Sequence, residues 1–171
     1  PNRRAVKAEE AAREAPQKKD SMVTQTVRRS RSSNRVDRRT YLENKYRNED
    51  DEFVCQLCGD LLNSCSFEKR NGEFYYWGGM LFPHLQRVNA ANGLFLCPLC
   101  GVKYKELVQS DANQVNSIER RVISTDPTVV DERDLVIEVD LNGSIEELRF
   151  VQTHWIDLRA ALSSEHREDG G

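Results

Sequence analysis

The chain contains no run of about 18 apolar residues, so the sequence predicts no membrane-spanning helix. Its first residues are charged and lack the apolar stretch of a secretory signal, so we expect a cytoplasmic protein whose thiols stay reduced. No segment of about 20–50 residues repeats, which argues against solenoid and propeller folds. A proline at position 1, in place of an initiating Met, suggests a processed chain or an excerpt of a longer one.

Charge of the two signs is unevenly distributed along the 171 residues, although the net charge is only −3. Residues 1–48 contain 14 Lys and Arg against 6 Asp and Glu, whereas residues 49–171 contain 11 against 22. The sequence therefore predicts a basic arm joined to an acidic body. The arm would meet either phosphate groups or the acidic surface of its own chain or of a neighbour.

Four of the five cysteines form two C-x-x-C-G motifs, at 55–59 and at 97–101. Two residues between cysteines allow a tight turn to direct both sulfur atoms at one centre, and the following glycine permits that turn. Zn²⁺ prefers four such ligands in a tetrahedron, which leaves no position for a catalytic water. The pattern predicts one structural zinc ion, and its ligands are Cys55, Cys58, Cys97 and Cys100.

A redox dithiol is the alternative interpretation of these motifs. It is less well supported, because the βαβ pattern that accompanies thioredoxin-like sites is missing from the sequence. The fifth cysteine, Cys65, is predicted to be a small, partly buried side chain rather than a further ligand.

The patterns around the motifs predict an α+β chain. We expect a basic, helical or extended arm over 1–50, then a treble-clef-like zinc domain over 51–125 with one knuckle in a hairpin turn and the other at a helix start. A β-hairpin and a helix over 126–165 would pack on this domain, and residues 166–171 are expected to be disordered.

Individual elements follow from periodicity and turn residues. Four segments have helical patterns: 2–15, 36–47 (capped by Ser33 or Asn34), 102–110 and 113–122. Three segments are rich in β-branched or aromatic residues and are predicted as strands: 22–27, 74–77 and 93–96. Asn142-Gly143 predicts a two-residue hairpin loop between strands at 135–141 and 145–151. Thr153 is then expected to cap a helix.

Apolar side chains lie on two of these helices. On the helix over 102–110, Val102, Leu107 and Val108 are available to a core, and the last helix carries Trp155, Ile156, Leu158, Ala161 and Leu162.

The first knuckle, the segment KRNGEFYYW at 69–77 and the segment NGLFLCPLC at 92–100 together resemble the zinc-supported HNH (ββα-metal) domains. In that family a strand ends in a His pair, of which the first acts as general base and the second ligates the catalytic metal. A middle Asn orients the loop, and another His follows the second knuckle. The resemblance covers residues 55–105.

This chain departs from the family at the catalytic positions. Gly78-Gly79 stands where the His pair should be, and no His directly follows Cys100, whereas Asn92 matches the middle Asn. The resemblance therefore implies a degenerate HNH-like fold without nuclease activity, because phosphodiester hydrolysis requires both water activation and charge neutralisation. The knuckles, the hairpin and the segment THWIDLRAAL at 153–162 are also similar to C-terminal modules of large bacterial ATP-binding proteins.

The first functional hypothesis is a non-catalytic zinc module that binds nucleic acid through the basic arm. Its candidate phosphate contacts are Arg28, Arg29, Arg31, Arg35, Arg38 and Arg39. Tyr75, Tyr76 and Trp77 are candidates for base stacking beside Lys69 and Arg70, although consecutive aromatics are more often split between core and surface.

Two alternatives remain open. One is a protein–protein interaction module of a larger assembly, in which zinc supplies only stability. The other is a divergent HNH nuclease with His84 as its base, although the ordinary interpretation of His84 is a loop histidine after Pro83. His154 is predicted to lie at a helix start and His166 in the tail. The sequence indicates neither a membrane nor a small-molecule substrate.

Overall fold

The structure, a computed structural model, describes residues 2–14, 37–85, 89–128 and 134–168. The elements in order are α1 (Asn2–Glu14), α2 (Arg38–Glu43), α3 (Leu62–Cys65), α4 (Pro98–Lys103), a π-helical turn η1 (Tyr104–Gln109), α5 (Ala112–Ser124), β1 (Leu135–Asp140), β2 (Ile145–Phe150) and α6 (Gln152–Glu168). Helices combine with a two-stranded antiparallel sheet, which confirms the predicted α+β class. The strand predicted over 22–27 lies outside the described residues, as do Arg28, Arg29, Arg31 and Arg35.

The β1–β2 hairpin forms where the sequence predicts it. The Leu141 N–H donates to the Ser144 carbonyl at 2.8 Å, which leaves Asn142 and Gly143 as the two loop residues. Their φ angles are 60° and 92°, and these positive values are what Asn-Gly tolerates in a tight hairpin turn. An isolated hairpin is marginally stable, so its apolar face packs into the core with Leu135, Ile137, Val139, Leu148 and Phe150.

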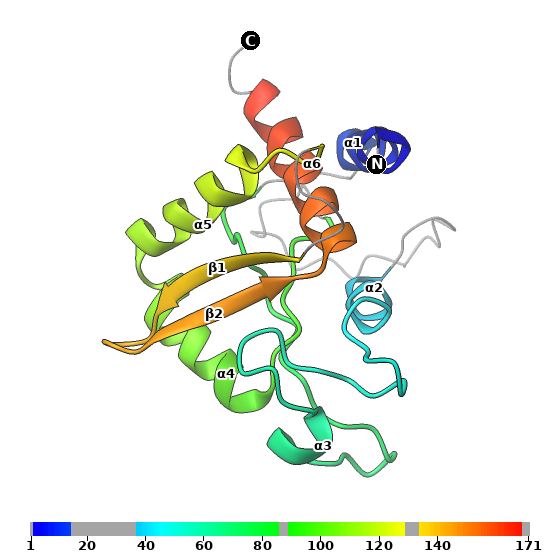
Figure 1. The fold of residues 1–171 in the computed structure, drawn as a ribbon, viewed down its shortest axis with the longest axis vertical. Helices are drawn as coiled ribbons and strands as arrows, with labels where there is room; N and C mark the ends of the chain where they lie inside the picture. The colour runs from blue at the N-terminus through cyan, green and yellow to red at the C-terminus, as the bar shows by residue number, and fades with distance from the viewer. Residues whose placement is uncertain (1, 15–36, 86–88, 129–133, 169–171) are drawn as a thin grey trace, which may run out of the picture.

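Helix α6 is the centre of the fold, with α1 on one side and α5 on the other (Figure 1). It begins at Gln152, so Thr153 is not its cap; the Thr153 hydroxyl instead accepts a hydrogen bond from Lys45 Nζ at 2.6 Å. The helix continues past residue 166, where disorder was expected, and His166 Nε2 lies 2.9 Å from Glu119 Oε1 on α5. The five apolar residues expected on this helix are all buried: Trp155, Ile156, Leu158, Ala161 and Leu162.

The basic N-terminal segment contributes two helices that attach to α6. Helix α1 confirms the helix predicted over 2–15, and its buried Ala8 and Ala12 allow a close approach to α6. Asp157 on α6 accepts hydrogen bonds from Arg4 Nε at 2.9 Å and from the Tyr41 hydroxyl of α2 at 2.6 Å. One carboxylate therefore links α1 and α2 to the central helix.

Helix α2 is shorter than the predicted 36–47 segment. Its N-cap is Asp37 rather than Ser33 or Asn34, and that side chain makes no capping hydrogen bond. The helix ends at Glu43 because the chain then turns to form a bridge between Arg47 and Phe53, which leads into the first cysteine motif.

The strands predicted over 74–77 and 93–96 are reduced to isolated bridges. Trp77 pairs with Leu96, and Phe74 pairs with Glu68. Pairing cannot continue beyond Leu96, because the Cys97 N–H donates to Cys55 Sγ at 3.3 Å and Pro98 has no N–H. The Cys97 N–H, which longer strand pairing would need, is thus used by the cysteine cluster.

The helix predicted over 102–110 begins earlier, at Pro98, and its second half is the π-helical turn. Tyr104 and Val108 on this turn are buried, whereas Val102, on α4 before it, is 59% exposed, so the prediction for Val102 was wrong. Helix α5 confirms the helix predicted over 113–122, and Asp111 caps it by accepting from the Asn113 N–H at 2.9 Å.

His154, near the start of α6, is fully buried and joins three segments. Its Nε2 donates to the Ala91 carbonyl at 2.8 Å, so its Nδ1 is the acceptor for the Tyr46 hydroxyl. Burial lowers the pKa of His154 from 6.5 to about 4, because a charged imidazole would lose its hydration there.

We expect the free energy of unfolding to fall by about 3 kcal/mol as the pH drops from 6.5 towards 4 on account of His154 alone. The unfolded chain takes up a proton below about pH 6.5, whereas the folded chain resists protonation until about pH 4. Urea denaturation at half-unit pH steps measures this slope. In His154→Gln the slope between these limits should be shallower, and an unchanged slope would show that His154 does not titrate on unfolding.

Candidate metal centre

The first cysteine motif lies in a small hairpin closed by a bridge between Val54 and Leu61. The Gly59 N–H donates to the Cys55 carbonyl at 3.0 Å, and Gly59 has a φ of 74°, which side chains rarely tolerate. The glycine after the second cysteine therefore serves the turn that the sequence predicts.

The second motif forms the start of α4. Cys97 is the N-cap, Pro98 occupies the first turn and Cys100 follows within the helix. Gly101 is needed for a different reason than Gly59, because a Cβ on Gly101 would lie 2.4 Å from the Cβ of Trp77. Close packing of Trp77, rather than a turn, requires the second glycine.

The two motifs bring four sulfur atoms together. The Sγ atoms of all four lie within 4.8 Å of one another, and this cluster could hold a metal ion; its members are Cys55, Cys58, Cys97 and Cys100. Four sulfurs about 2.3 Å from one ion in a tetrahedron are about 3.8 Å apart, so the observed limit suits a single ion. All but Cys58 are buried, which limits the access of water.

The electrostatics of the cluster favour a cation. Donation from the Cys100 thiol, together with backbone N–H groups, lowers the pKa of Cys55 to about 5 despite its burial. The same hydrogen bond and burial raise the pKa of Cys100, and burial raises that of Cys58. A divalent cation is what would stabilise four thiolates at this separation.

Gln56, between the two cysteines of the first motif, is a site residue that sequence reasoning missed. Its buried amide accepts from the Phe95 N–H at 2.6 Å and donates to the Arg149 carbonyl at 3.0 Å. Its backbone N–H and carbonyl bond the same two residues, both at 3.0 Å. Gln56 thus joins the first motif to the segment before the second and to β2, and no local sequence signal reveals partners so distant.

Cys65 is half-buried and lies outside the four-sulfur cluster, as predicted. Its thiol donates to the Leu61 carbonyl at 3.2 Å, and burial raises its pKa to about 12.

Asn92, which matches the middle Asn of the HNH pattern, closes the loop before the second motif. Its buried side chain accepts from the Phe82 N–H and donates to the Phe82 carbonyl, both at 2.8 Å. Where the family has its His pair, a Cβ on Gly79 would lie 2.0 Å from the Trp77 ring. The indole of Trp77 occupies that space, so a histidine at position 79 would require rearrangement.

His84, the candidate base, lies in the loop after Pro83 and is not part of the sulfur cluster. Its Nε2 is 3.3 Å from Glu119 Oε2 of α5, and its ring is 5.7 Å from that of Phe82.

The consecutive aromatics are split between core and surface. Tyr76 stacks on Phe95 with ring centroids 4.1 Å apart, and Trp77 packs against the buried Tyr104. Tyr75 points outward instead and is 37% exposed. Of the three stacking candidates, Tyr75 is therefore the one that a ligand can reach most readily.

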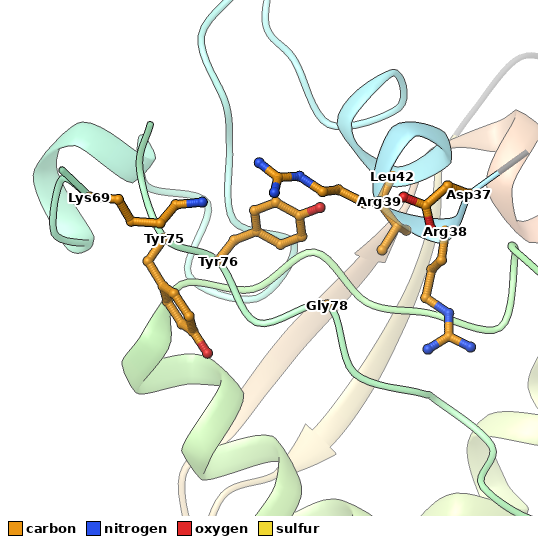
Figure 2. A pocket seen from close by; sticks show the side chains of 8 residues that line it. All are labelled: Asp37, Arg38, Arg39, Leu42, Lys69, Tyr75, Tyr76 and Gly78. Atoms are coloured by element: carbon orange, nitrogen blue, oxygen red, sulfur yellow. The ribbon is translucent and has the colours of Figure 1, made fainter. Parts of the chain in front are cut away.

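A hollow of about 370 Å³ lies beside these aromatics, between α2 and residues 69–78. Figure 2 shows the Arg39 and Lys69 side chains pointing toward each other past the ring of Tyr76. Arg38 also lines the hollow; its Nε is buried and has no hydrogen-bond partner within the described residues. Two of the six predicted arginines are therefore beside the predicted aromatics, and the other four lie outside the described residues.

None of the helices in the described ranges has the length and apolarity needed to cross a bilayer. Comparison with protein-family models, curated proteins and solved structures finds no match for the chain.

Proposed function

We propose that this chain is a non-catalytic zinc module of treble-clef type that binds nucleic acid. Four thiolates in a closed tetrahedral arrangement are typical of structural zinc, and the short distances between the sulfurs favour one ion over a larger cluster. One motif in a hairpin turn and the other at a helix start support the treble-clef interpretation. With no position left for water, the ion would hold the two motifs together.

The observation that carries the nucleic-acid proposal is the hollow between α2 and residues 69–78. Arg38, Arg39 and Lys69 supply cations there, and Tyr75 and Tyr76 supply aromatic rings. Cations track the phosphate backbone and aromatic rings stack on bases, so this combination suits nucleic acid. Arg28, Arg29, Arg31 and Arg35 precede α2 in the sequence and add four further cations to the chain.

We expect alanine substitution of all six arginines to weaken DNA binding by the full chain at least tenfold and to flatten its salt dependence. Each lost phosphate contact lowers the slope of log K against log salt by about 0.7–0.9, because fewer counterions are released. Fluorescence anisotropy with a labelled oligonucleotide at several salt concentrations measures both quantities.

Arg120→Ala is the control for losing one arginine elsewhere on the chain, because Arg120 is exposed on α5 and lies outside the hollow. It should leave affinity and slope close to those of the wild type. Equal binding by the six-arginine variant and the wild type would refute the role of the basic arm.

A protein–protein interaction module is the second candidate. Leu99 and Val102 are 63% and 59% exposed, and they lie three residues apart on α4, next to the cysteine cluster. Two large apolar side chains on one face of a short helix suit contact with another protein. This candidate takes precedence if the wild-type chain shows no salt-dependent binding to either single-stranded or duplex DNA.

A further inference from the structure

Three hydrogen-bond donors converge on one exposed carboxylate oxygen at the edge of the hollow. Glu73 Oε2 accepts from Arg39 Nη2 at 2.7 Å, from Lys69 Nζ at 3.0 Å and from Asn71 Nδ2 at 2.9 Å. Arg39 comes from α2, whereas the other donors belong to the turn that carries Glu73 itself. Hydrogen bonds from Arg39, Lys69 and Asn71 lower the pKa of Glu73 to about 2.

This arrangement is a ready-made anion site that the chain fills with its own side chain. An arginine, a lysine and an amide directed at one oxygen are the charge-assisted contacts that phosphate oxygens receive in proteins. The Glu73 side chain is 49% exposed, so a ligand can compete for its position. Such solvated ion pairs contribute little to stability, so loosening this one costs the fold little.

An aromatic surface lies on the same short hairpin. Glu68 and Phe74 form an antiparallel β-bridge between the two strands of this hairpin, and the Tyr75 N–H donates to the Phe67 carbonyl at 3.0 Å. The rings of Phe67 and Tyr75 stack with centroids 5.1 Å apart and planes 10° from parallel. Phe67 is 56% exposed, so the pair presents flat aromatic surface to the solvent.

The hairpin over 67–75 thus carries the aromatic pair and three of the four groups of the anion cluster. Its turn is fixed by Gly72, whose φ is 81°, and by the Gly72 N–H donating to the Lys69 carbonyl at 2.9 Å. Lys69, Tyr75 and Arg39 all line the hollow, and Figure 2 shows Lys69 and Arg39 extending toward each other while the Tyr75 ring extends away from them. The adjoining hollow has a volume at the lower end of the range of about 300–1,000 Å³ seen for small-ligand pockets.

We propose that this hairpin binds single-stranded nucleic acid, with a phosphate replacing Glu73 on Arg39, Lys69 and Asn71 and a neighbouring base stacking on Tyr75. The proposal rests on the proposed function and names its substrate class and its contacts. A single strand fits because its bases are free to stack on side chains, whereas duplex bases are already stacked on one another. Glu73 then acts as an internal competitor that limits affinity until a phosphate displaces it.

Binding of the full chain to fluorescein-labelled oligothymidylate of 12 nucleotides, and to the matching duplex, tests this proposal. We expect Glu73→Gln to tighten single-strand binding about fivefold, because it removes the competing charge and retains a side chain of the same size. Tyr75→Ala should weaken single-strand binding about tenfold and leave duplex binding unchanged.

Glu147→Gln is the matched control. Glu147 is exposed on β2, where it pairs with Arg149 at 3.5 Å, so the substitution makes the same change in net charge away from the hairpin. Its affinity should stay at the wild-type value. Equal tightening by both glutamine variants would mean that overall charge alone acts, and it would overturn the proposal.

Other outcomes separate this proposal from the one on which it rests. If Glu73→Gln and Tyr75→Ala bind the single strand like the wild type while the six-arginine variant loses binding, the hairpin site is wrong and the nucleic-acid function stands. A lower melting temperature without tighter binding in Glu73→Gln would assign Glu73 a structural role and also refute the site. If neither the wild type nor Glu73→Gln binds any oligonucleotide, both proposals fail.

Discussion

Cys97→Ser is expected to lower the zinc content from about one ion per chain to near zero and to destabilise the fold severely. Cys97 is buried, it begins α4, and its N–H donates to Cys55 Sγ, so the substitution removes a ligand at the point where the two motifs meet. Zinc binding contributes about 10–16 kcal/mol in zinc-finger peptides, which matches or exceeds the whole stability of a typical domain. Elemental analysis and thermal melting by circular dichroism measure the two effects.

Cys65→Ser is the internal control for this substitution. Its sulfur is half-buried and outside the cluster, so this variant should keep about one zinc per chain and melt within a few degrees of the wild type. A Cys97→Ser chain with its full zinc content would contradict the assigned ligands. Loss of zinc from Cys65→Ser would show that the set of ligands is different.

Trp155→Ala has the second-largest expected effect, a loss of about 3–5 kcal/mol in the free energy of unfolding. Trp155 is fully buried on α6, which packs against both α1 and α5. Truncation leaves a cavity at the centre of the fold, because the surrounding helices cannot move far enough to fill it. Urea denaturation in the presence of zinc measures the loss, and Trp77 remains as a fluorescence probe.

Trp155→Phe separates packing from hydrogen bonding at the same position. The Trp155 Nε1 has no hydrogen-bond partner within the described residues. Replacement by Phe therefore breaks no hydrogen bond there and removes only part of the ring volume. We expect this variant to lose less than about half as much stability as Trp155→Ala. Equal losses, or a Trp155→Ala chain within about 1 kcal/mol of the wild type, would mean that α6 is not the centre of the core.

Elements with strong local signals were predicted best. Asn142-Gly143 accepts the positive φ angles that a two-residue loop demands, so the hairpin position follows from a dipeptide and the alternation beside it. The helix α6 was likewise expected from its apolar residues, and these, including Trp155 and Leu162, are buried. The C-x-x-C spacing brought the four sulfurs together in the prediction because each pair is set by its own short turn.

Features that depend on distant partners were missed. Ala8 and Ala12 offer no apolar stripe, yet their small size allows α1 to pack closely on α6. Val102 is exposed because the buried face of α4 carries Cys100 and Gly101 instead, and the π-helical turn that follows has no local sequence signal. Glu73 looks like an ordinary exposed acid until the fold brings Arg39 of α2 to its side.

The HNH resemblance remains a prediction. Asn92 holds Phe82 by two hydrogen bonds, which agrees with a loop-orienting Asn. The Trp77 ring over Gly79, however, fills space that a catalytic histidine would need.

The zinc K-edge X-ray absorption spectrum of the purified full chain, combined with elemental analysis, is the sharpest test of the four-cysteine zinc site. We expect about one zinc per chain with four sulfur neighbours at about 2.3 Å and no oxygen or nitrogen ligand. A chain that folds without bound zinc, or a zinc ion with nitrogen or oxygen ligands, would contradict the assignment of Cys55, Cys58, Cys97 and Cys100.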